Sequence, residues 1–210
     1  MLPFGAIEGD WSDRPLYIIG GGPSLRGFDF SRLKGRKLGV NKSAWEANCD
    51  ALCSLDQHFC RRSRSQIQAF VDNGGEAVLS MPSTEDGHKP INGATYVYRQ
   101  RNQGLSANPT TLFGVHSGYA ALNLAFLKNA REIALLGYDM HGEDKDGQTH
   151  WHGGYEWHSK RNHKFYDSFS RNFDLAARQL RESGVTVINF VGDPPSKLTE
   201  FPVRPLGDLI

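Results

Sequence analysis

The 210-residue chain has little cysteine, no long apolar run and almost no net charge. Its three cysteines, Cys49, Cys53 and Cys60, form neither a C-x-x-C motif nor two pairs that could hold zinc, so we expect reduced and partly buried thiols. Apolar stretches such as 133–136 fall far short of the roughly 20 residues that a bilayer-spanning helix needs. The formal charge of +1 creates no overall field that would collect nucleic acid or anionic lipid.

The first ten residues contain no Lys or Arg and no continuous apolar stretch, unlike a secretory signal peptide. This favours a cytoplasmic protein. A composition of 39% apolar and 22% charged residues is that of an ordinary globular chain. We therefore expect one α/β domain over 1–210, which can bury roughly 70% of its unfolded surface.

Short apolar segments that end in polar or glycine-rich loops recur along the chain. Strands are predicted over 16–19, 37–40, 51–55, 76–80, 94–99, 132–137 and 185–190, and helices over 63–73, 117–129 and from 165 up to Gly184. This alternation predicts a Rossmann-like fold with a mostly parallel sheet flanked by helices. Polar residues that follow the strands, such as Asn41 and Asp56, should then meet at the carboxyl-terminal edge, where such sheets bind ligands.

Two segments, 81–109 and 138–160, are predicted to be irregular loops or lids. The second holds four of the eight histidines together with Trp151, Tyr155 and Trp157, and should lie over the carboxyl-terminal edge of the sheet. The tail from Gly192 contains four prolines and is expected to wrap over the surface.

The loop after the first predicted strand places Gly20, Gly21 and Gly22 where backbone N–H groups can point at a phosphate or a ribose. Pro23 stiffens the turn, and Ser24 can cap or donate. The loop matches neither the G-x-G-x-x-G fingerprint nor a Walker loop, and a plain tight turn between strand and helix is the alternative.

Two further sites on the same edge could bind an anion or a polar ligand. Ser117 and Gly118 open a predicted helix, whose N-terminus favours an anion, although a simple helix cap is an equal alternative. Asp139 ends a predicted strand and could accept a ribose hydroxyl, a metal ion or the amides of a neighbouring loop.

His150 and His152 lie on the same side of an extended segment, as metal ligands often do. Together with Asp139 they could hold Zn²⁺, but no H-E-x-x-H motif or cysteine partner completes such a site, and general acid or base chemistry is favoured. The aromatic residues around them could stack on a base or a sugar, or pack the loop onto the sheet.

The order of these motifs resembles a known superfamily. The chain has I-I-G-G-G-P-S-L at 18–25, a strand ending at Asn41, Ser117-Gly118, and L-L-G-Y-D at 135–139. This succession is similar to the group that unites Campylobacter-type bacterial sialyltransferases, flagellar motility accessory factors and MptE-like pterin pyrophosphokinases. The H-W-H-G loop and the I-N-F segment at 188–190 most resemble its small phage and prophage members.

The resemblance implies a Rossmann-like nucleotide-binding domain across roughly 16–198. Its nucleotide-binding positions are matched here by Gly20, Gly22, Pro23, Ser24, Asn41, Ser117, Gly118 and Asp139. The sialyltransferases have asparagine where this chain has Gly21, and a catalytic histidine where it has Phe169. The base should therefore come from the nearby loop, with His152, His158 and His150 as candidates in that order.

These observations lead to a first hypothesis and two alternatives. The first is a nucleotide-dependent transferase, sialyltransferase-like, that moves a sugar from a nucleotide-activated donor to an unidentified acceptor. The second is an Mg²⁺-dependent pyrophosphokinase, with Asp139 and Asp56 holding the metal between phosphates. The third is a non-catalytic, phage-encoded module that binds a nucleotide or a host protein in the bacterial cytoplasm. The sequence leaves open whether the chain forms a homo-oligomer.

Overall fold

The computed structural model describes residues 4–82, 90–141, 149–153, 155, 169–170, 173–192 and 196–209. These residues form a nine-stranded sheet in the order β6-β5-β4-β3-β2-β1-β7-β8-β9, and every neighbouring pair of strands is parallel. The predicted Rossmann-like α/β fold is therefore confirmed, with a sheet that is wholly parallel. Within the described ranges no helix is long and apolar enough to cross a bilayer.

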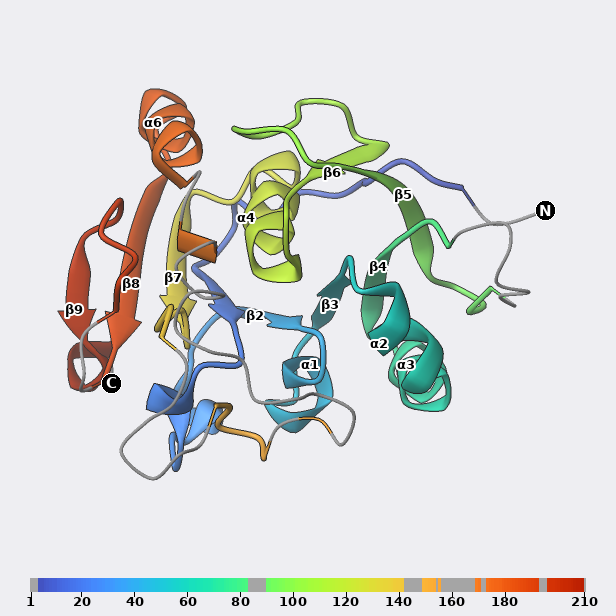
Figure 1. The fold of residues 1–210 in the computed structure, drawn as a ribbon, viewed down its shortest axis with the longest axis horizontal. Helices are drawn as coiled ribbons and strands as arrows, with labels where there is room; N and C mark the ends of the chain where they lie inside the picture. The colour runs from blue at the N-terminus through green and yellow to red at the C-terminus, as the bar shows by residue number, and fades with distance from the viewer. Residues whose placement is uncertain are drawn as a thin grey trace.

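The strands are β1 Leu16–Ile19, β2 Arg36–Val40, β3 Ala51–Ser54, β4 Glu76–Ser80, β5 Thr95–Gln100, β6 Thr111–Phe113, β7 Glu132–Leu136, β8 Thr186–Val191 and β9 Val203–Pro205. The α-helices are α1 Ser43–Glu46, α2 Gln57–Arg62, α3 Arg64–Asp72, α4 Ser117–Leu127 and α6 Phe173–Glu182. Short 3₁₀ turns cover Pro23–Leu25, Phe30–Arg32 and Leu206–Leu209. Figure 1 shows α4 and α6 on one face of the sheet and α1, α2 and α3 on the other.

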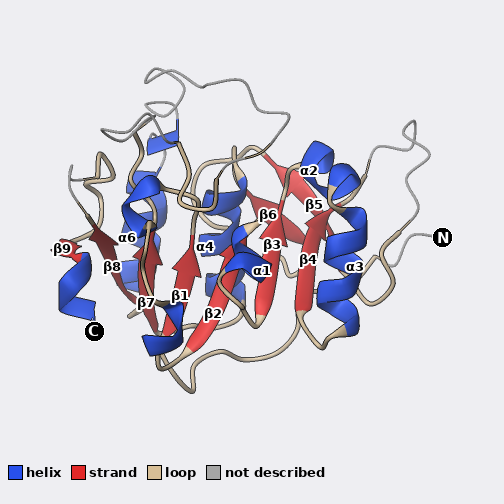
Figure 2. Ribbon diagram, turned by 90° about the horizontal axis from the view of Figure 1, so that it is seen from below, coloured by secondary structure: helices blue, strands red, loops and turns tan. Residues whose placement is uncertain are grey.

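The order of the strands reverses next to β1. From β1 the chain moves outward through β2 to β6, returns along α4, and adds β7 on the opposite side of β1. Connections therefore leave β1 and β7 in opposite directions, and a crevice opens beyond their carboxyl ends, where open α/β sheets bind ligands. Figure 2 shows the strand arrows pointing toward this edge, with loops above it.

Helix α4 covers one face of the sheet and is largely apolar. Ala120, Ala121, Leu122, Leu124 and Ala125 are fully buried. A largely apolar helix of this kind belongs inside a protein core. This packing holds the N-terminus of α4 at the carboxyl-terminal edge of the sheet.

Of the described strands and α-helices, four were not predicted from the sequence: β6, β9, α1 and α2. Residues 203–205 pair with β8, so the proline-rich tail adds an edge strand as well as covering the surface. Pro205 is tolerated because an edge position does not require its missing N–H. β6 has only three residues, too few for a clear periodic signal, and α2 is a short helix capped by Asp56.

The three cysteines are free and buried, as expected. Burial raises the pKa of both Cys49 and Cys60 to about 12. At neutral pH these thiols are protonated and unreactive, so they act as small core residues.

Candidate functional site

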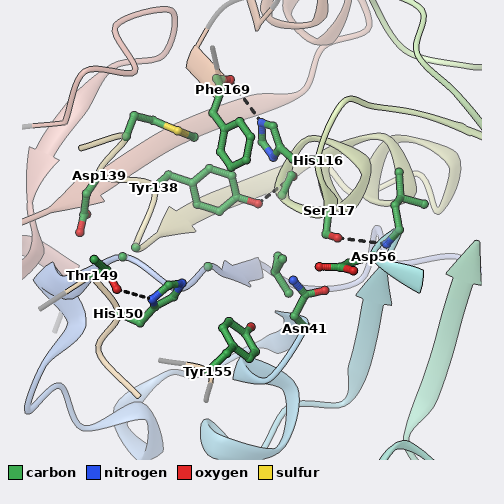
Figure 3. Close-up of a pocket in the computed structure, with 18 of the residues that line it drawn as sticks. Asn41, Asp56, His116, Ser117, Tyr138, Asp139, Thr149, His150, Tyr155 and Phe169 are labelled. Carbon is green, nitrogen blue, oxygen red and sulfur yellow. Dashed lines mark hydrogen bonds between the residues drawn. The ribbon is translucent and has the colours of Figure 1, made fainter. Parts of the chain in front are cut away.

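A cavity of about 720 Å³ lies at the carboxyl-terminal edge of the sheet, around the ends of β1, β2, β3 and β7. Figure 3 shows the side chains that surround it. Seven of the nine residues predicted to bind a nucleotide line this one cavity: Gly20, Gly21, Gly22, Asn41, Ser117, Gly118 and Asp139. The fold thus brings together segments that are up to 119 positions apart in the sequence.

The glycine loop forms the wall above β1. The Gly20 N–H donates to Leu136 O at 2.8 Å, and the Gly22 N–H donates to Gly137 O at 3.0 Å. The Gly21 N–H between them has no acceptor among the described residues. The loop is therefore held against β7 by two of its amides, and the third remains available to a ligand.

Asp139 anchors this loop from behind. Its two carboxylate oxygens accept hydrogen bonds from the Ser24 hydroxyl at 2.6 Å and the Ser24 N–H at 2.9 Å. Burial raises the pKa of Asp139, and the two bonds from Ser24 oppose that rise. The sequence analysis considered a ribose hydroxyl, a metal ion or loop amides as partners of Asp139. In the structure its backbone partner is the amide of the neighbouring glycine loop, at Ser24. Ser24 and the buried Pro23 lie outside the cavity lining.

Asn41 follows β2 in the left-handed region, with φ 55°, a conformation that asparagine tolerates better than most residues. Its side-chain oxygen is buried and has no hydrogen-bond partner in the part of the chain that the structure describes. A buried polar atom without a partner costs about 1–3 kcal/mol. Asn41 lines the cavity, where a ligand can supply the missing bond.

The N-terminus of α4 forms the opposite wall, and both of its predicted residues also make structural contacts. The Ser117 hydroxyl accepts a bond from the Leu55 N–H at 3.0 Å, and the Gly118 carbonyl accepts one from the Tyr138 hydroxyl at 2.8 Å. Ser117 keeps its own hydroxyl proton to donate, so it can still contact a ligand.

His116 caps α4 and was missed by the sequence analysis. Its Nδ1 accepts the Tyr119 N–H at 3.2 Å, and its Nε2 lies 3.2 Å from the Phe169 carbonyl. A carbonyl can only accept, so Nε2 carries the proton and the imidazole is neutral. Its ring stacks on Phe169, with centroids 4.2 Å apart. Both nitrogens are occupied, so His116 positions the helix and is not a free base.

Acid should destabilise the protein through His116. Burial lowers the pKa of His116 to about 4, from an unfolded value near 6.5. As the pH falls, His116 binds a proton in the unfolded chain at a higher pH than in the folded protein. The stabilisation is therefore complete above pH 6.5 and declines as the pH falls toward 4. Urea unfolding should show a loss of about 2 kcal/mol between pH 7.5 and pH 5. His116→Asn keeps a capping side chain and should remove most of this pH dependence; an unchanged dependence would show that another group causes it.

The histidine-rich loop contributes His150 to the cavity wall. Thr149 Oγ1 lies 2.8 Å from His150 Nδ1, and a Cβ added at Gly21 would come within 2.9 Å of His150 Cδ2. His152 does not line the cavity; its ring forms a cluster with His150 and Tyr155, and each pair of ring centroids is 5.2 or 5.3 Å apart. His158, the third candidate, lies outside the described residues. Of the two described candidates, His150, the last of the three in the predicted order, is the one that lines the cavity.

Trp151 packs the loop onto the sheet. Its indole N–H donates to Gly20 O at 3.0 Å, its backbone N–H donates to Gly21 O at 3.2 Å, and its ring contacts Phe30. The aromatic residues of this loop were expected either to stack on a ligand or to pack the loop onto the sheet, and Trp151 packs the loop. Tyr155 lines the cavity, and Trp157 lies outside the described residues.

A second buried histidine lines the cavity. His141 is only 8% exposed. Neither of its ring nitrogens has a hydrogen-bond partner among the residues the structure describes. The cavity lining thus contains His141 as well as His150.

The far end of the cavity contains polar side chains from β3, α2 and β5. Asp56 follows β3, His58 lies in α2, and Arg99 reaches over from β5. The Arg99 guanidinium donates to three carbonyls, those of Leu55, Gly114 and Val115. It thereby fixes the loop before α4.

The described residues fit a metal site poorly. Both oxygens of Asp139 already accept hydrogen bonds from Ser24. No group of three or more His, Cys, Asp or Glu side chains in the described ranges is arranged to hold a metal ion. The Mg²⁺ and Zn²⁺ hypotheses therefore remain predictions, and we build no step on them.

The fold and this cavity define a Rossmann-like α/β protein with a cavity at its switch point. No family model and no curated protein matches the chain. Its structure is similar to a MAf glycosyltransferase from Magnetospirillum magneticum AMB-1, with a TM-score of 0.55 and 13% identity, over 97% of this chain and 35% of that chain. The chain thus spans about a third of that protein. It is also similar to the sialyltransferase CstII from Campylobacter jejuni, solved with the substrate analogue cytidine-5'-monophosphate, with a TM-score of 0.49 and 14% identity, over 92% and 86% of the two chains.

The MAf similarity shows a shared fold, in agreement with the fold that the sequence resemblance implies. Membership of the phage or pyrophosphokinase groups stays a prediction. What the chain binds and which reaction it performs have to be argued from its own site.

Proposed function

We propose that this chain binds a nucleotide-activated sugar and transfers the sugar to an acceptor hydroxyl, as a glycosyltransferase-like enzyme. The observation that carries the proposal is the convergence of seven predicted nucleotide-binding residues on one cavity at the switch point. Its volume of about 720 Å³ lies within the range of small-molecule sites. The fold shared with a glycosyltransferase supports the same class.

The phosphate groups of the donor fit the end of the cavity that contains Gly21. The Gly21 N–H is available there, and His150 adds an imidazole group. When the bond between sugar and phosphate breaks, negative charge develops on the phosphate oxygen. Donors held in place before the reaction stabilise that charge without reorganising, and His150 is the residue we assign to this role.

Asn41 provides recognition between the two ends of the cavity. Its buried side-chain oxygen lacks a partner in the described structure, so a ligand N–H or O–H would satisfy it. A site that is built to hydrogen-bond its ligand also rejects ligands that cannot make the bond. We therefore expect Asn41 to contribute to both affinity and selectivity.

Thermal unfolding with nucleotides tests the proposal. The protein is heated with CMP, CDP, CTP, ATP or GTP, each with and without Mg²⁺, and with Zn²⁺ alone. A ligand at a hundred times its Kd adds about 2.7 kcal/mol, which raises the Tm of a chain of this size by roughly 5–11 °C. We expect a shift with at least one nucleotide that does not require metal.

The control variant is Asn41→Gly, which removes the side-chain amide and tolerates the positive φ. It should reduce the nucleotide shift while the Tm of the free protein changes little. A shift that requires Mg²⁺ and a purine triphosphate would favour the pyrophosphokinase. No shift with any nucleotide would contradict the proposal and favour a module that binds a protein.

A further inference from the structure

We propose that Asp56 is the catalytic base that takes the proton from the acceptor hydroxyl. The inference rests on the proposed glycosyl transfer and names the residue that activates the acceptor. Asp56 lies directly after β3 and lines the cavity together with Asn41 and Ser117. In Figure 3 these three side chains lie on one side of the cavity, away from His150 and Thr149.

The Asp56 carboxylate is oriented by the fold. One oxygen accepts the Phe59 N–H at 3.0 Å, as the N-cap of α2, and the Asp56 N–H donates to the Ser54 hydroxyl at 3.2 Å. The other carboxylate oxygen has no hydrogen-bond partner in the described part of the chain. A carboxylate with one oxygen fixed and one open to a cavity can accept a hydrogen bond, and then a proton, from a bound hydroxyl.

The Arg99 guanidinium does not form a hydrogen bond with the Asp56 carboxylate. Arg99 also lines the cavity, and its donors are directed at the carbonyls of Leu55, Gly114 and Val115.

The other titratable groups of the cavity are less suited to this step. Asp139 is buried and uses both oxygens to hold Ser24. His116 has both ring nitrogens engaged. His150 borders the glycine loop, where the donor phosphate is expected, and both ring nitrogens of His141 are buried. Asp56 lies at the end of the cavity that remains for the acceptor.

The step balances as follows. The acceptor oxygen attacks the anomeric carbon and forms the new C–O bond, while the bond from that carbon to the phosphate oxygen breaks. The electron pair of the broken bond leaves with the nucleotide, and the acceptor proton passes to the open oxygen of Asp56. A proton transfer of this kind typically accelerates a reaction by about 10²–10⁴-fold.

The test compares the parent protein with Asp56→Asn and Asp56→Gly, because Asn and Gly are both accepted at a helix N-cap. Nucleotide release from CMP-, UDP- and GDP-sugars is measured with water or added glycosides as acceptors, and nucleotide binding is measured by thermal shift. We expect both variants to keep the nucleotide shift and to lose at least 100-fold in turnover. Formate, a small external base, should restore part of the activity to Asp56→Gly and none to the parent.

The control variant is Asp208→Asn, at an exposed aspartate. It should match the parent protein in both turnover and nucleotide binding. Undiminished turnover in Asp56→Asn, or low turnover in Asp56→Gly that formate does not restore, would overturn the assignment of the base. A parent protein that binds nucleotide but releases none from any sugar nucleotide would overturn the transfer and the base together. If the parent protein binds none of the nucleotides, the proposed function itself is refuted.

Discussion

Gly22→Ala should destabilise the protein by about 3–5 kcal/mol and lower its Tm by roughly 10 °C or more. A Cβ at this position would lie 2.4 Å from Asp139 Oδ2 and 2.6 Å from Gly137 O. Gly22 has φ −60°, which any residue can adopt, so the requirement for glycine is purely spatial. To make room, the Asp139 carboxylate would have to leave Ser24, and a buried charged group would lose two hydrogen bonds.

Gly207→Ala is the matched control. Nothing lies within 4 Å of a Cβ added at Gly207, and its φ is not positive. This substitution should change the free energy of unfolding by no more than about 0.5 kcal/mol. Urea unfolding of both variants makes the comparison, and equal stabilities would show that the loop is not packed against Asp139 as described.

Replacing His150 by glutamine should lower turnover of the nucleotide donor by about 10²–10⁴-fold. His150 lies on the cavity wall against Gly21, where it can hydrogen-bond the departing phosphate. Glutamine keeps a polar side chain of similar length but cannot carry the proton or the positive charge of imidazolium. The measurement is nucleotide release under saturating donor, with nucleotide binding followed in parallel.

His152→Gln provides the comparison, because the sequence alone favoured His152 over His150. The His152 ring packs against His150 and Tyr155 and does not line the cavity, so its loss should affect stability more than turnover. If His152→Gln instead abolishes turnover in a protein that is still folded, the order predicted from the sequence is right and our assignment of roles is wrong.

The sequence by itself determined the class of the fold and identified many of the residues that line the cavity. The boundaries of β1 and β4 are those predicted, because short apolar segments closed by glycine or polar residues are a local signal. Parallel strands bring their carboxyl ends to one edge, so Asn41, Asp56 and Asp139 could be placed near one another from strand order alone.

The tertiary structure decided which of these residues face the cavity. Ser24 and Asp139 are 115 positions apart, and no local pattern indicates that they bond to each other and hold the loop. The choice of His150 over His152 depends on how Trp151 anchors the loop to Gly20. The capping role of His116 depends on the Phe169 carbonyl, 53 positions away. The periodicity of apolar residues indicates which face of a segment is buried. The hydrogen-bond partner of a polar side chain depends instead on long-range packing. In this protein, that packing determines which polar groups support the cavity and which face it.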